Sequence, residues 1–372
     1  MGPARLRLGI VGVGFWVVTS VCLLVFDAPS TLRSHLPNGM SGDAVLMGLM
    51  LALYVLIQTP FDLLGGYIIP KRYARPIQPF RCEAWAWLRG VVGHGLLLSG
   101  SAAAIYTGGF LGGWVGACVA GLIGVSLLAA CRGLVARVVA SLPPDDTVAE
   151  MGNGPGLHAQ LRHSQDEGFT GGITGFVTPK LNVMPAAWRD ELTADGFALA
   201  DARRESVIRS GAWRAGRYAA LIYTALGLFL ALLLAGPHSA GTAVGVVETS
   251  LWFTLWSFGG LLTLPSLSRR AVYRIDRDML DRGNDPQAYH QLWSTLDGKQ
   301  DDEPTRNKWV ERIFHPVPSV TNRTNRDKLT GVALWDVART SVYLGIGGLS
   351  LLTRSVHCNV GRPELWIWLP TD

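Results

Sequence analysis

The sequence predicts a mainly α-helical, polytopic membrane protein with six membrane-spanning helices, a seventh and more polar candidate span, and a cytoplasmic α+β domain. Of its 372 residues, 49% are hydrophobic and only 16% are charged, and the mean hydropathy is +0.25. Soluble proteins have about a quarter of their residues charged. The apolar residues form blocks long enough to cross a bilayer, which takes roughly 20 residues. Lys and Arg cluster beside alternate blocks.

Six apolar stretches account for the predicted spans. They cover residues 8–26, 44–69, 88–106, 110–131, 218–235 and 244–264. The first is expected to be an uncleaved anchor, because it is long for a signal peptide and no small-x-small cleavage site precedes Asp27. Gly108 and Gly109 are expected to form the turn between the third and fourth spans.

The seventh stretch, residues 329–352, contains Asp336 and Arg339. At positions i and i+3 these two side chains can neutralise each other on one helix face. Charged groups are nevertheless costly inside a bilayer, so this stretch could also pack against the hairpin or lie at the interface. The aromatic tail at 364–368 is expected to anchor at the membrane interface.

The positively charged residues predict the orientation. They flank one end of the spans, whereas the short loops at the other end contain only Arg33. The basic flanks comprise Lys71, Arg72, Arg75, Arg81, Arg132, Arg137, Arg209, Arg214, Arg217, Arg269, Arg270, Arg274 and Arg277. The N-terminus and both long polar segments are therefore expected on the cytoplasmic side of a bacterial-type inner membrane. The net charge of +5 reflects these flanks, so the expected partner is the lipid bilayer and not nucleic acid.

These features divide the chain into five parts. They are a four-helix membrane block (1–138), a cytoplasmic segment (139–217), a transmembrane hairpin (218–264), a second cytoplasmic segment (265–328), and a C-terminal apolar helix with its tail (329–372). Within the first cytoplasmic segment, a Gly-rich passage at 168–175 precedes a short strand at 180–184. A helical stretch is expected from Pro185 to Arg217.

The sequence lacks the common metal and nucleophile motifs. None of its eight histidines belongs to an H-E-x-x-H sequence, which places two imidazoles and a Glu on one helix face. His158 and His163 are five residues apart and therefore lie off a common helix face. The five cysteines contain no C-x-x-C, and there is no G-x-S-x-G. The residues themselves predict neither a metal nor a cofactor.

The order of features nevertheless resembles the membrane-bound zinc metallopeptidases of the HtpX and CAAX prenyl protease type. Those proteins have membrane helices, a loop and short strand, a helix with H-E-x-x-H, a membrane hairpin, a helix with E-x-x-x-D, and a late His-Pro motif followed by Arg. The corresponding parts here are Thr170–Met184, Ala200–Arg217, Tyr218–Leu264, Ser268–Gly283, and Phe314-His315-Pro316 with Arg323. The resemblance covers residues 168–323 and rests on order and spacing.

The resemblance implies a zinc site that has lost its ligands. Arg204-Glu205-Ser206-Val207-Ile208 occupies the place of H-E-x-x-H, and Val272 and Asp276 occupy the place of E-x-x-x-D. Arg204 and Ile208 replace the two His ligands, and Val272 replaces the Glu ligand. Arg204 also puts a positive charge where a dication would bind. The chain would then be a pseudo-peptidase that binds a partner or a membrane-protein segment without hydrolysing it.

The remaining positions of the resemblance have two interpretations each. Without a metal to activate water, Glu205 is expected to form an i, i+4 ion pair with Arg209 and not to act as a base. His315, Pro316 and Arg323 would contact the substrate in an active relative, or would fix a loop in this chain.

An active zinc metallopeptidase is the first alternative function. It would need ligands outside this alignment, for which the candidates are His158, His163, Glu205 and His315. Zinc would then be its cofactor.

A small transporter or channel is the second alternative. Asp62, His94 and Glu248 lie in predicted spans and would form its path, because ionisable groups at membrane depth are often functional. Asp62 and His94 could face each other across the bundle. Asp62 could instead extend toward the basic residues at the cytoplasmic end of its span.

Overall fold

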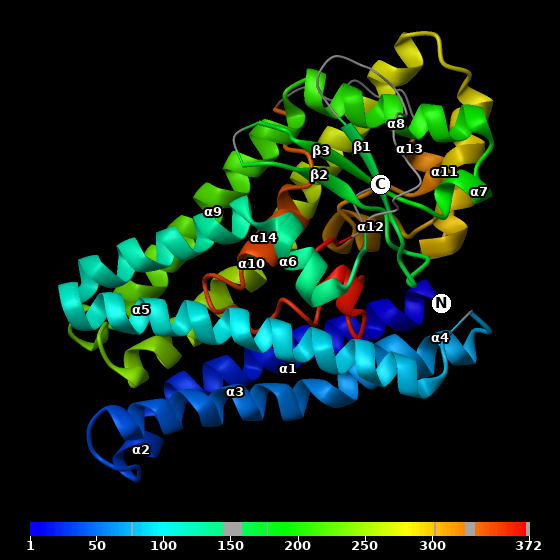
Figure 1. Cartoon of the computed structure of the whole chain (residues 1–372). Helices are drawn as coiled ribbons and strands as arrows, with labels where there is room; N and C mark the ends of the chain where they lie inside the picture. The colour runs from blue at the N-terminus through cyan, green and yellow to red at the C-terminus, as the bar shows by residue number, and fades with distance from the viewer. Residues whose placement is uncertain (76, 144–157, 177, 301–302, 324–331, 370–372) are drawn as a thin grey trace.

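The computed structural model describes residues 1–75, 77–143, 158–176, 178–300, 303–323 and 332–369. It has three parts (Figure 1): a bundle of long helices, a small globular domain with a three-stranded sheet, and a C-terminal segment that fills the space between them. The structure confirms the prediction of a mainly helical protein with membrane-spanning helices.

The bundle contains four helices that are long and apolar enough to cross a membrane. They are α1 (Gly2–Val25), α3 (Met40–Leu63) with its continuation to Arg72, α5 (Phe80–Ala130) and α9 (Ala212–Leu234). Many of the exposed large apolar side chains lie on these helices, for example Val11, Leu56, Leu96 and Ile222. Such a surface is favourable in lipid and costly in water.

Helix α5 contains both the third and the fourth predicted spans. Its backbone is non-helical at Gly112 and Gly113, where the φ of Gly113 is +58°, so the element is two helices joined at a sharp bend. The turn lies four residues beyond the predicted Gly108–Gly109. A positive φ favours glycine, and Gly113 provides it.

The sixth predicted span forms the first half of α10 (Ala243–Asp281), which is not among the four apolar candidates. Thr242 caps its start by accepting a hydrogen bond from the Gly245 N–H, at 3.1 Å. A short 3₁₀ turn, η3 (Pro237–Ser239), joins α9 to α10. Since α10 has 39 residues, its second half extends past Pro265 into the globular domain, so one continuous helix connects the two parts.

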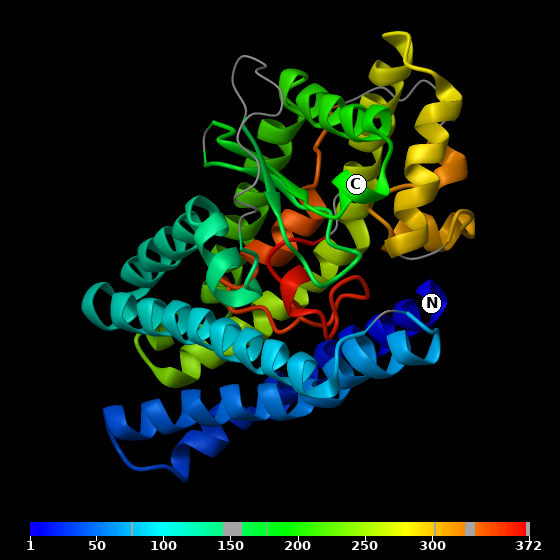
Figure 2. The ribbon, with the colours of Figure 1, turned by 45° about the vertical axis from the view of Figure 1, so that its right-hand side comes forward.

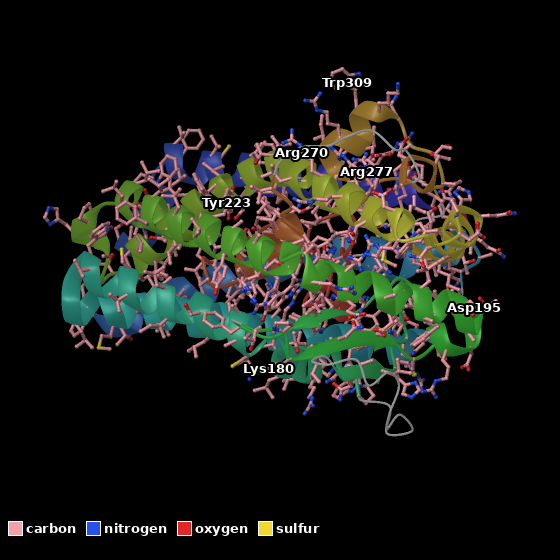
Figure 3. All side chains as sticks on the ribbon, turned by 90° about the horizontal axis from the view of Figure 1, so that it is seen from above. Lys180, Asp195, Tyr223, Arg270, Arg277 and Trp309 are labelled. Carbon is pink, nitrogen blue, oxygen red and sulfur yellow. The ribbon has the colours of Figure 1, made fainter. Side chains whose placement is uncertain are left out.

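The bundle has two distinct ends (Figure 1). One end holds the helix α2 (Ala28–Ser34), the bend of α5 and the α9–α10 connection. The N-terminus and the globular domain lie at the other end. Viewed from above (Figure 3), Asp195 and Arg277 lie at the globular end, whereas Tyr223 lies along the bundle. The alternation of basic loops agrees with this two-ended arrangement.

The globular domain is built on strands β1 (His158–Arg162), β2 (Gly172–Thr174) and β3 (Leu181–Pro185) in the order β1-β3-β2. β1 is parallel to β3, and β2 is antiparallel to it with Ile173 opposite Asn182. The strand predicted at 180–184 is thus β3. The domain's helices are α7 (Trp188–Glu191), α8 (Ala194–Arg209), α11 (Pro286–Gln300), α12 (Lys308–Phe314) and α13 (Val320–Arg323).

Near the bundle lie four further short elements. The π turn η1 (Leu64–Ile68) leads from α3 into α4 (Ile69–Arg72), and α6 (Arg132–Val135) with the π turn η2 (Ala136–Ala140) follows α5. The helical stretch predicted up to Arg217 is broken at Gly211, whose φ of +73° ends α8 and lets α9 begin in a new direction.

The C-terminal segment, residues 332–369, corrects the seventh predicted span. Its only α-helix is α14 (Val337–Leu344), which has eight residues, and turns and the short η4 (Pro363–Leu365) follow. Eight residues cannot cross a bilayer. The helix ends at Gly345, and Leu349 has a φ of +66°. Irregular backbone is tolerated at membrane depth only when protein covers it, and nearly all of this segment is buried.

The C-terminal segment therefore forms the centre of the molecule (Figure 2). The large side chains of Arg354, Trp366 and Trp368 in this segment are fully buried. Arg132 donates from Nε to the Ile367 carbonyl at 3.0 Å, which ties the segment to the end of the bundle. The tail expected to anchor at the interface is thus part of the core.

Candidate functional site

Arg204, at the presumed first zinc-ligand position, lies on α8 and is buried. Its Nη1 donates to Asn182 Oδ1 at 2.8 Å, and the guanidinium also donates to the carbonyls of Val183 and Thr170. The guanidinium carbon of Arg204 lies 5.5 Å from the centroid of the Trp188 ring. The guanidinium thus joins α8 to β3 and to the loop before β2, which is a structural role.

Asp276, on α10, is held by two buried partners. Arg203 Nε donates to its Oδ1 at 2.7 Å, and both side chains of this ion pair are fully buried. The Tyr289 hydroxyl donates to the same oxygen at 2.7 Å. The Arg203 guanidinium lies 4.8 Å from the Trp293 ring. Asp276 therefore links α8, α10 and α11.

The other positions of the presumed zinc site do not form a cavity. Val272 is buried, and Ile208 packs beside Val207, Trp213 and Ile275. Among the residues that the structure describes, no group of three or more His, Cys, Asp or Glu side chains could hold a metal ion. The side chains at the three presumed ligand positions are the guanidinium of Arg204 and the alkyl groups of Ile208 and Val272, none of which can coordinate zinc.

Glu205 is exposed and pairs with Arg209 at 3.3 Å, as the i, i+4 spacing predicts. His163 lies in the loop after β1, where it lines a cavity between the bundle and the globular domain that is described below. His315 is buried and its ring meets that of His357 edge to face, with centroids 5.0 Å apart. The side chain of His158 lies outside the described part of the chain. The candidate ligands of the active-protease alternative are thus dispersed wherever the structure describes them.

The late His-Pro motif fixes a loop. The His315 carbonyl accepts a hydrogen bond from Arg269 Nη1 at 2.9 Å, and Pro316 is buried. Arg323 lies 3.8 Å from the Trp293 ring centroid. His315, Arg323 and Arg339 line one small cavity of about 20 Å³, which is too small for a peptide.

Asp336 and Arg339 lie beside different cavities. Asp336 adopts a φ of +58° before α14 and accepts a hydrogen bond from Thr340 Oγ1 at 3.0 Å. It lines a cavity of about 10 Å³ with Arg132 and Arg217. Arg339 lines the other cavity, the one of about 20 Å³ that His315 and Arg323 also line. The prediction that these two groups share one face of a spanning helix therefore needs correction, because the turn at Asp336 separates their directions.

Asp62 forms a buried ion pair with Arg354 of the C-terminal segment. It also accepts hydrogen bonds from Gln58 Nε2 at 3.1 Å and Trp87 Nε1 at 3.0 Å. Since Asp62 is only 1% exposed, it does not extend to the membrane surface. Its role in the structure is to hold the C-terminal segment against α3.

His94 lies near the same ion pair, with its ring centroid 6.0 Å from the rings of both Tyr54 and Trp366. Arg354 lies 4.4 Å from the Trp366 ring. Glu248, in contrast, lies in the second turn of α10, at the bundle end remote from the globular domain. The three residues therefore do not line one path.

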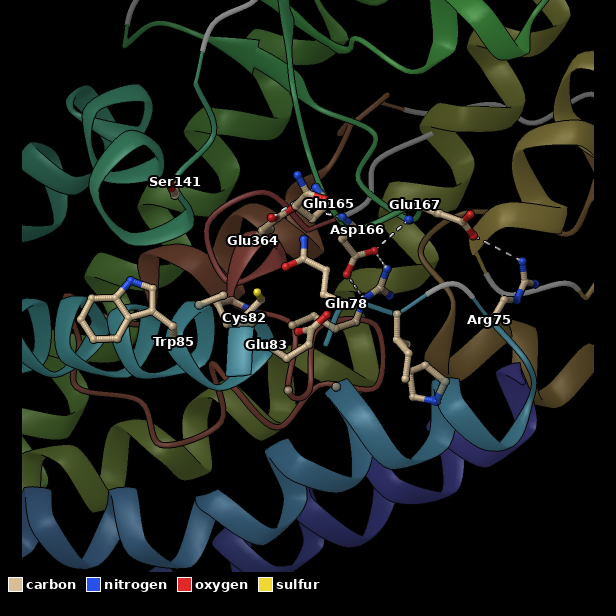
Figure 4. Close-up of a pocket in the computed structure, with 18 of the residues that line it drawn as sticks. Arg75, Gln78, Cys82, Glu83, Trp85, Ser141, Gln165, Asp166, Glu167 and Glu364 are labelled. Atoms are coloured by element: carbon tan, nitrogen blue, oxygen red, sulfur yellow. Dashed lines mark hydrogen bonds and ion pairs between the residues drawn. The ribbon is translucent and has the colours of Figure 1, made fainter. Parts of the chain in front are cut away.

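The largest of the cavities described here lies where the bundle meets the globular domain. We call it the interfacial cavity; its volume is about 630 Å³. Seven segments line it (Figure 4): the start of α1, residues 66–75 with 77–78, the first turns of α5, residues 141–143, the loop at 163–168, Lys299, and residues 361–364. Sequence analysis did not identify it, because no motif joins segments so far apart in the chain.

The acidic groups that the globular domain and the C-terminal segment contribute to this cavity, Asp166 and Glu364, have shifted pKa values. Burial tends to raise the pKa of Asp166, but the Arg362 guanidinium, which donates from Nε at 2.5 Å, outweighs burial and lowers it. Burial, with the adjacent charge of Asp166, raises the pKa of Glu364 to about 7. The Glu364 carboxylate accepts hydrogen bonds from the Ser164 hydroxyl and from the N–H groups of Gln165 and Asp166.

A second large space, which we call the bundle groove, lies within the membrane helices. It has a volume of about 510 Å³. Its walls are α1, α3, α5 and α10, and the side chains of Leu349 and Leu351 close one side. The lining is mostly Leu, Met, Val and Ala, with Trp16 and Tyr54 as its largest members. Such a lining suits an apolar ligand.

No protein-family model matches this sequence, and no curated protein matches it either. The metallopeptidase resemblance therefore stays a prediction based on the order of elements.

Proposed function

We propose that this chain is a non-hydrolytic membrane protein that binds the apolar chain of a membrane amphiphile in the bundle groove. The single observation that carries the proposal is the groove of about 510 Å³, which has an apolar lining and is built by helices that themselves face lipid. The degenerate metallopeptidase scaffold is compatible with this role, because a scaffold without catalytic ligands can still bind.

The geometry at the presumed zinc position supports the non-hydrolytic part. Arg204 is bonded to β3, and Arg203 and Asp276 neutralise each other in the core. The Glu205 carboxylate pairs with Arg209 at the surface, and Arg204, Ile208 and Val272 offer no metal ligand that would activate water beside it.

The size of the groove favours a lipid-type chain over a protein segment. One turn of α-helix, about 10–12 Å wide and 5.4 Å long, occupies roughly 400–600 Å³. A groove of about 510 Å³ could enclose one such turn but not a spanning helix. A flexible hydrocarbon chain is thin enough to lie along it. A membrane-protein segment, which the sequence alone suggested, is thus the less favoured occupant.

The proposal is tested by replacing a glycine that lines the groove with a large side chain that occupies the space. Gly48 lines the groove, and a Cβ placed on it meets no atom within 4 Å, so Gly48→Phe projects into the space without a backbone clash. Gly14, on α1, is equally open and does not line the groove, so Gly14→Phe is the matched control. Each purified protein is incubated with a phospholipid that carries a photoreactive group in its acyl chain, and labelled peptides are identified by mass spectrometry.

We expect α3 and α10 peptides of the natural sequence to be labelled, Gly48→Phe to lose most of this labelling, and Gly14→Phe to keep it. Equal labelling of all three proteins contradicts the proposal. Co-purification of a protein whose apolar segment cross-links to the same peptides would show that the occupant is a protein.

For the location, we propose a bacterial-type inner membrane with the N-terminus and the globular domain in the cytoplasm. The bias of Lys and Arg toward one end supports this orientation. Single cysteines in a cysteine-free background test it, with Phe26→Cys at the α2 end and Trp309→Cys on the globular domain; both natural side chains are exposed. A membrane-impermeant maleimide should label the first in intact cells and the second only after lysis. The reverse pattern would show the opposite orientation.

A further inference from the structure

We infer that the interfacial cavity binds an anionic phosphate group and that Arg81 and Arg89 are its principal ligands. The inference goes beyond the proposed function, because this cavity and the bundle groove are lined by different residues.

The cavity lies at the level where a membrane surface would meet the protein. The first turns of α5 form one of its walls, and α5 continues from there as a spanning helix. Trp85, on this wall, is 65% exposed. Trp side chains are enriched at membrane–water interfaces. Figure 4 shows Trp85, Cys82 and Glu83 on the α5 wall and Glu364 and Gln165 on the opposite side.

The lining carries an excess of positive charge. It contains six basic side chains, Arg5, Arg75, Arg81, Arg89, Lys299 and Arg362, and four acidic ones, Glu83, Asp166, Glu167 and Glu364, for a net charge of +2. Protonation of Glu364, whose pKa is about 7, makes the cavity more positive below neutral pH. A cavity of this sign attracts anions.

Several of these charges already have partners within the protein. Asp166 binds Arg362, and Glu167 lies 3.7 Å from Arg75. Lys299 pairs with Glu191 at 2.5 Å. These groups neutralise one another and shape the cavity, so they are not the ones that a ligand would need.

Arg81 and Arg89 differ from this group. Arg81 is exposed and has no hydrogen bond or ion pair with any residue that the structure describes. Arg89 donates only one long hydrogen bond, from Nη2 to the Ala140 carbonyl at 3.5 Å, and its buried Nε has no partner among the described residues. With Trp85 between them, they occupy positions i, i+4 and i+8 and share one face of α5.

Two guanidinium groups beside the start of a long helix fit a phosphate. Guanidinium groups bind phosphate oxygens through paired N–H donors, and a helix N-terminus adds favourable electrostatics. Pro79 precedes the helix without a side-chain cap, and the one acidic side chain in the first turn is Glu83, whose charge Arg81 and Arg89 together exceed. The phosphate could belong to a lipid headgroup or to a soluble phosphate ester.

The test uses the full chain in detergent and three probes: dihexanoyl phosphatidylglycerol, inorganic phosphate at constant ionic strength, and dihexanoylglycerol, which lacks phosphate. Affinities are obtained from the ligand dependence of the melting temperature. The variants are Arg81→Gln, Arg89→Gln and the double variant. Arg72→Gln is the control, because Arg72 is exposed near the same end of the bundle and does not line the cavity.

We expect each cavity variant to bind phosphatidylglycerol roughly fivefold more weakly, since one basic side chain near an anionic lipid surface contributes about that factor. Arg72→Gln should bind like the natural sequence, and dihexanoylglycerol should not distinguish the proteins. Arginine-dependent binding of phosphatidylglycerol alone identifies a lipid headgroup, and arginine-dependent binding of inorganic phosphate as well identifies a soluble source. If neither anion depends on Arg81 or Arg89, the inference is wrong, whatever the result of the groove experiment.

Discussion

The buried ion pair between Arg203 and Asp276 allows a direct test of the structural role assigned to the presumed zinc site. Asp276→Asn preserves the shape of the side chain and leaves an oxygen to accept from the Tyr289 hydroxyl. It removes the negative charge that neutralises Arg203, and both side chains are fully buried. The perturbation is therefore the loss of one charge in a closed, low-dielectric environment.

The expected loss is large for a single isosteric change. Removing one member of a buried ion pair costs about 3–5 kcal/mol, because the remaining charge is buried without compensation. For a folding unit of 150–250 residues, 1 kcal/mol corresponds to roughly 2–4 °C, so the melting temperature should fall by roughly 6–20 °C. Glu205→Gln removes an exposed pair on the same helix and should cost less than about 0.5 kcal/mol, because solvent screens that pair.

Thermal unfolding of the detergent-purified protein, followed by intrinsic fluorescence, measures both variants. Arg203→Met, alone and combined with Asp276→Asn, completes the cycle, since removing the uncompensated cation in the double variant should restore part of the lost stability. A melting temperature of Asp276→Asn within about 2 °C of the natural sequence would refute the assigned role. So would a double variant whose loss equals the sum of the single losses.

Two further predictions concern the C-terminal segment. The pKa of Glu364 is raised from 4.5 to about 7, so the folded state holds a proton that the unfolded state releases. The free energy of unfolding should therefore fall by up to about 3 kcal/mol as the pH rises from about 4.5 to 7. The melting temperature of Glu364→Gln should accordingly rise relative to that of the natural sequence between pH 5 and pH 8, and a constant difference between the two proteins would contradict the shift. Gly361 has a φ of +71°, and a Cβ there would lie 2.0 Å from the Asp62 carbonyl oxygen. Gly39 has a φ of +79°, but a Cβ there would meet no atom within 4 Å. Gly361→Ala should therefore lower the melting temperature far more than Gly39→Ala, and equal effects would mean that the close packing against α3 is not present.

The parts of the fold that sequence analysis predicted correctly depend on local patterns. Apolar length alone indicates α1, α3, α5 and α9, because a bilayer requires a continuous run of apolar residues. The Glu205–Arg209 pair follows from i, i+4 spacing on one helix.

The parts that it missed depend on contacts between distant segments. Residues 332–352 are apolar like a span, and only the tertiary structure shows that protein and not lipid surrounds them. Asp62 was identified as a costly intramembrane charge, but its partner Arg354 lies 292 positions away in the chain. The interfacial cavity has the same origin, since its walls come from both ends of the sequence.

The central position of the C-terminal segment has a consequence for the order in which the protein can assemble. Residues 332–369 are translated after every helix that surrounds them, yet α1 and α5 pack directly on them, as at Gly9 beside His357 and Gly90 beside Pro363. The helices must therefore enter the membrane while the space at their centre is still unfilled. Asp62 then has no Arg354 until residue 354 has been translated. Final packing is thus a late, post-insertion event, and ribosomes stalled before residue 332 should carry a bundle that proteases can still open.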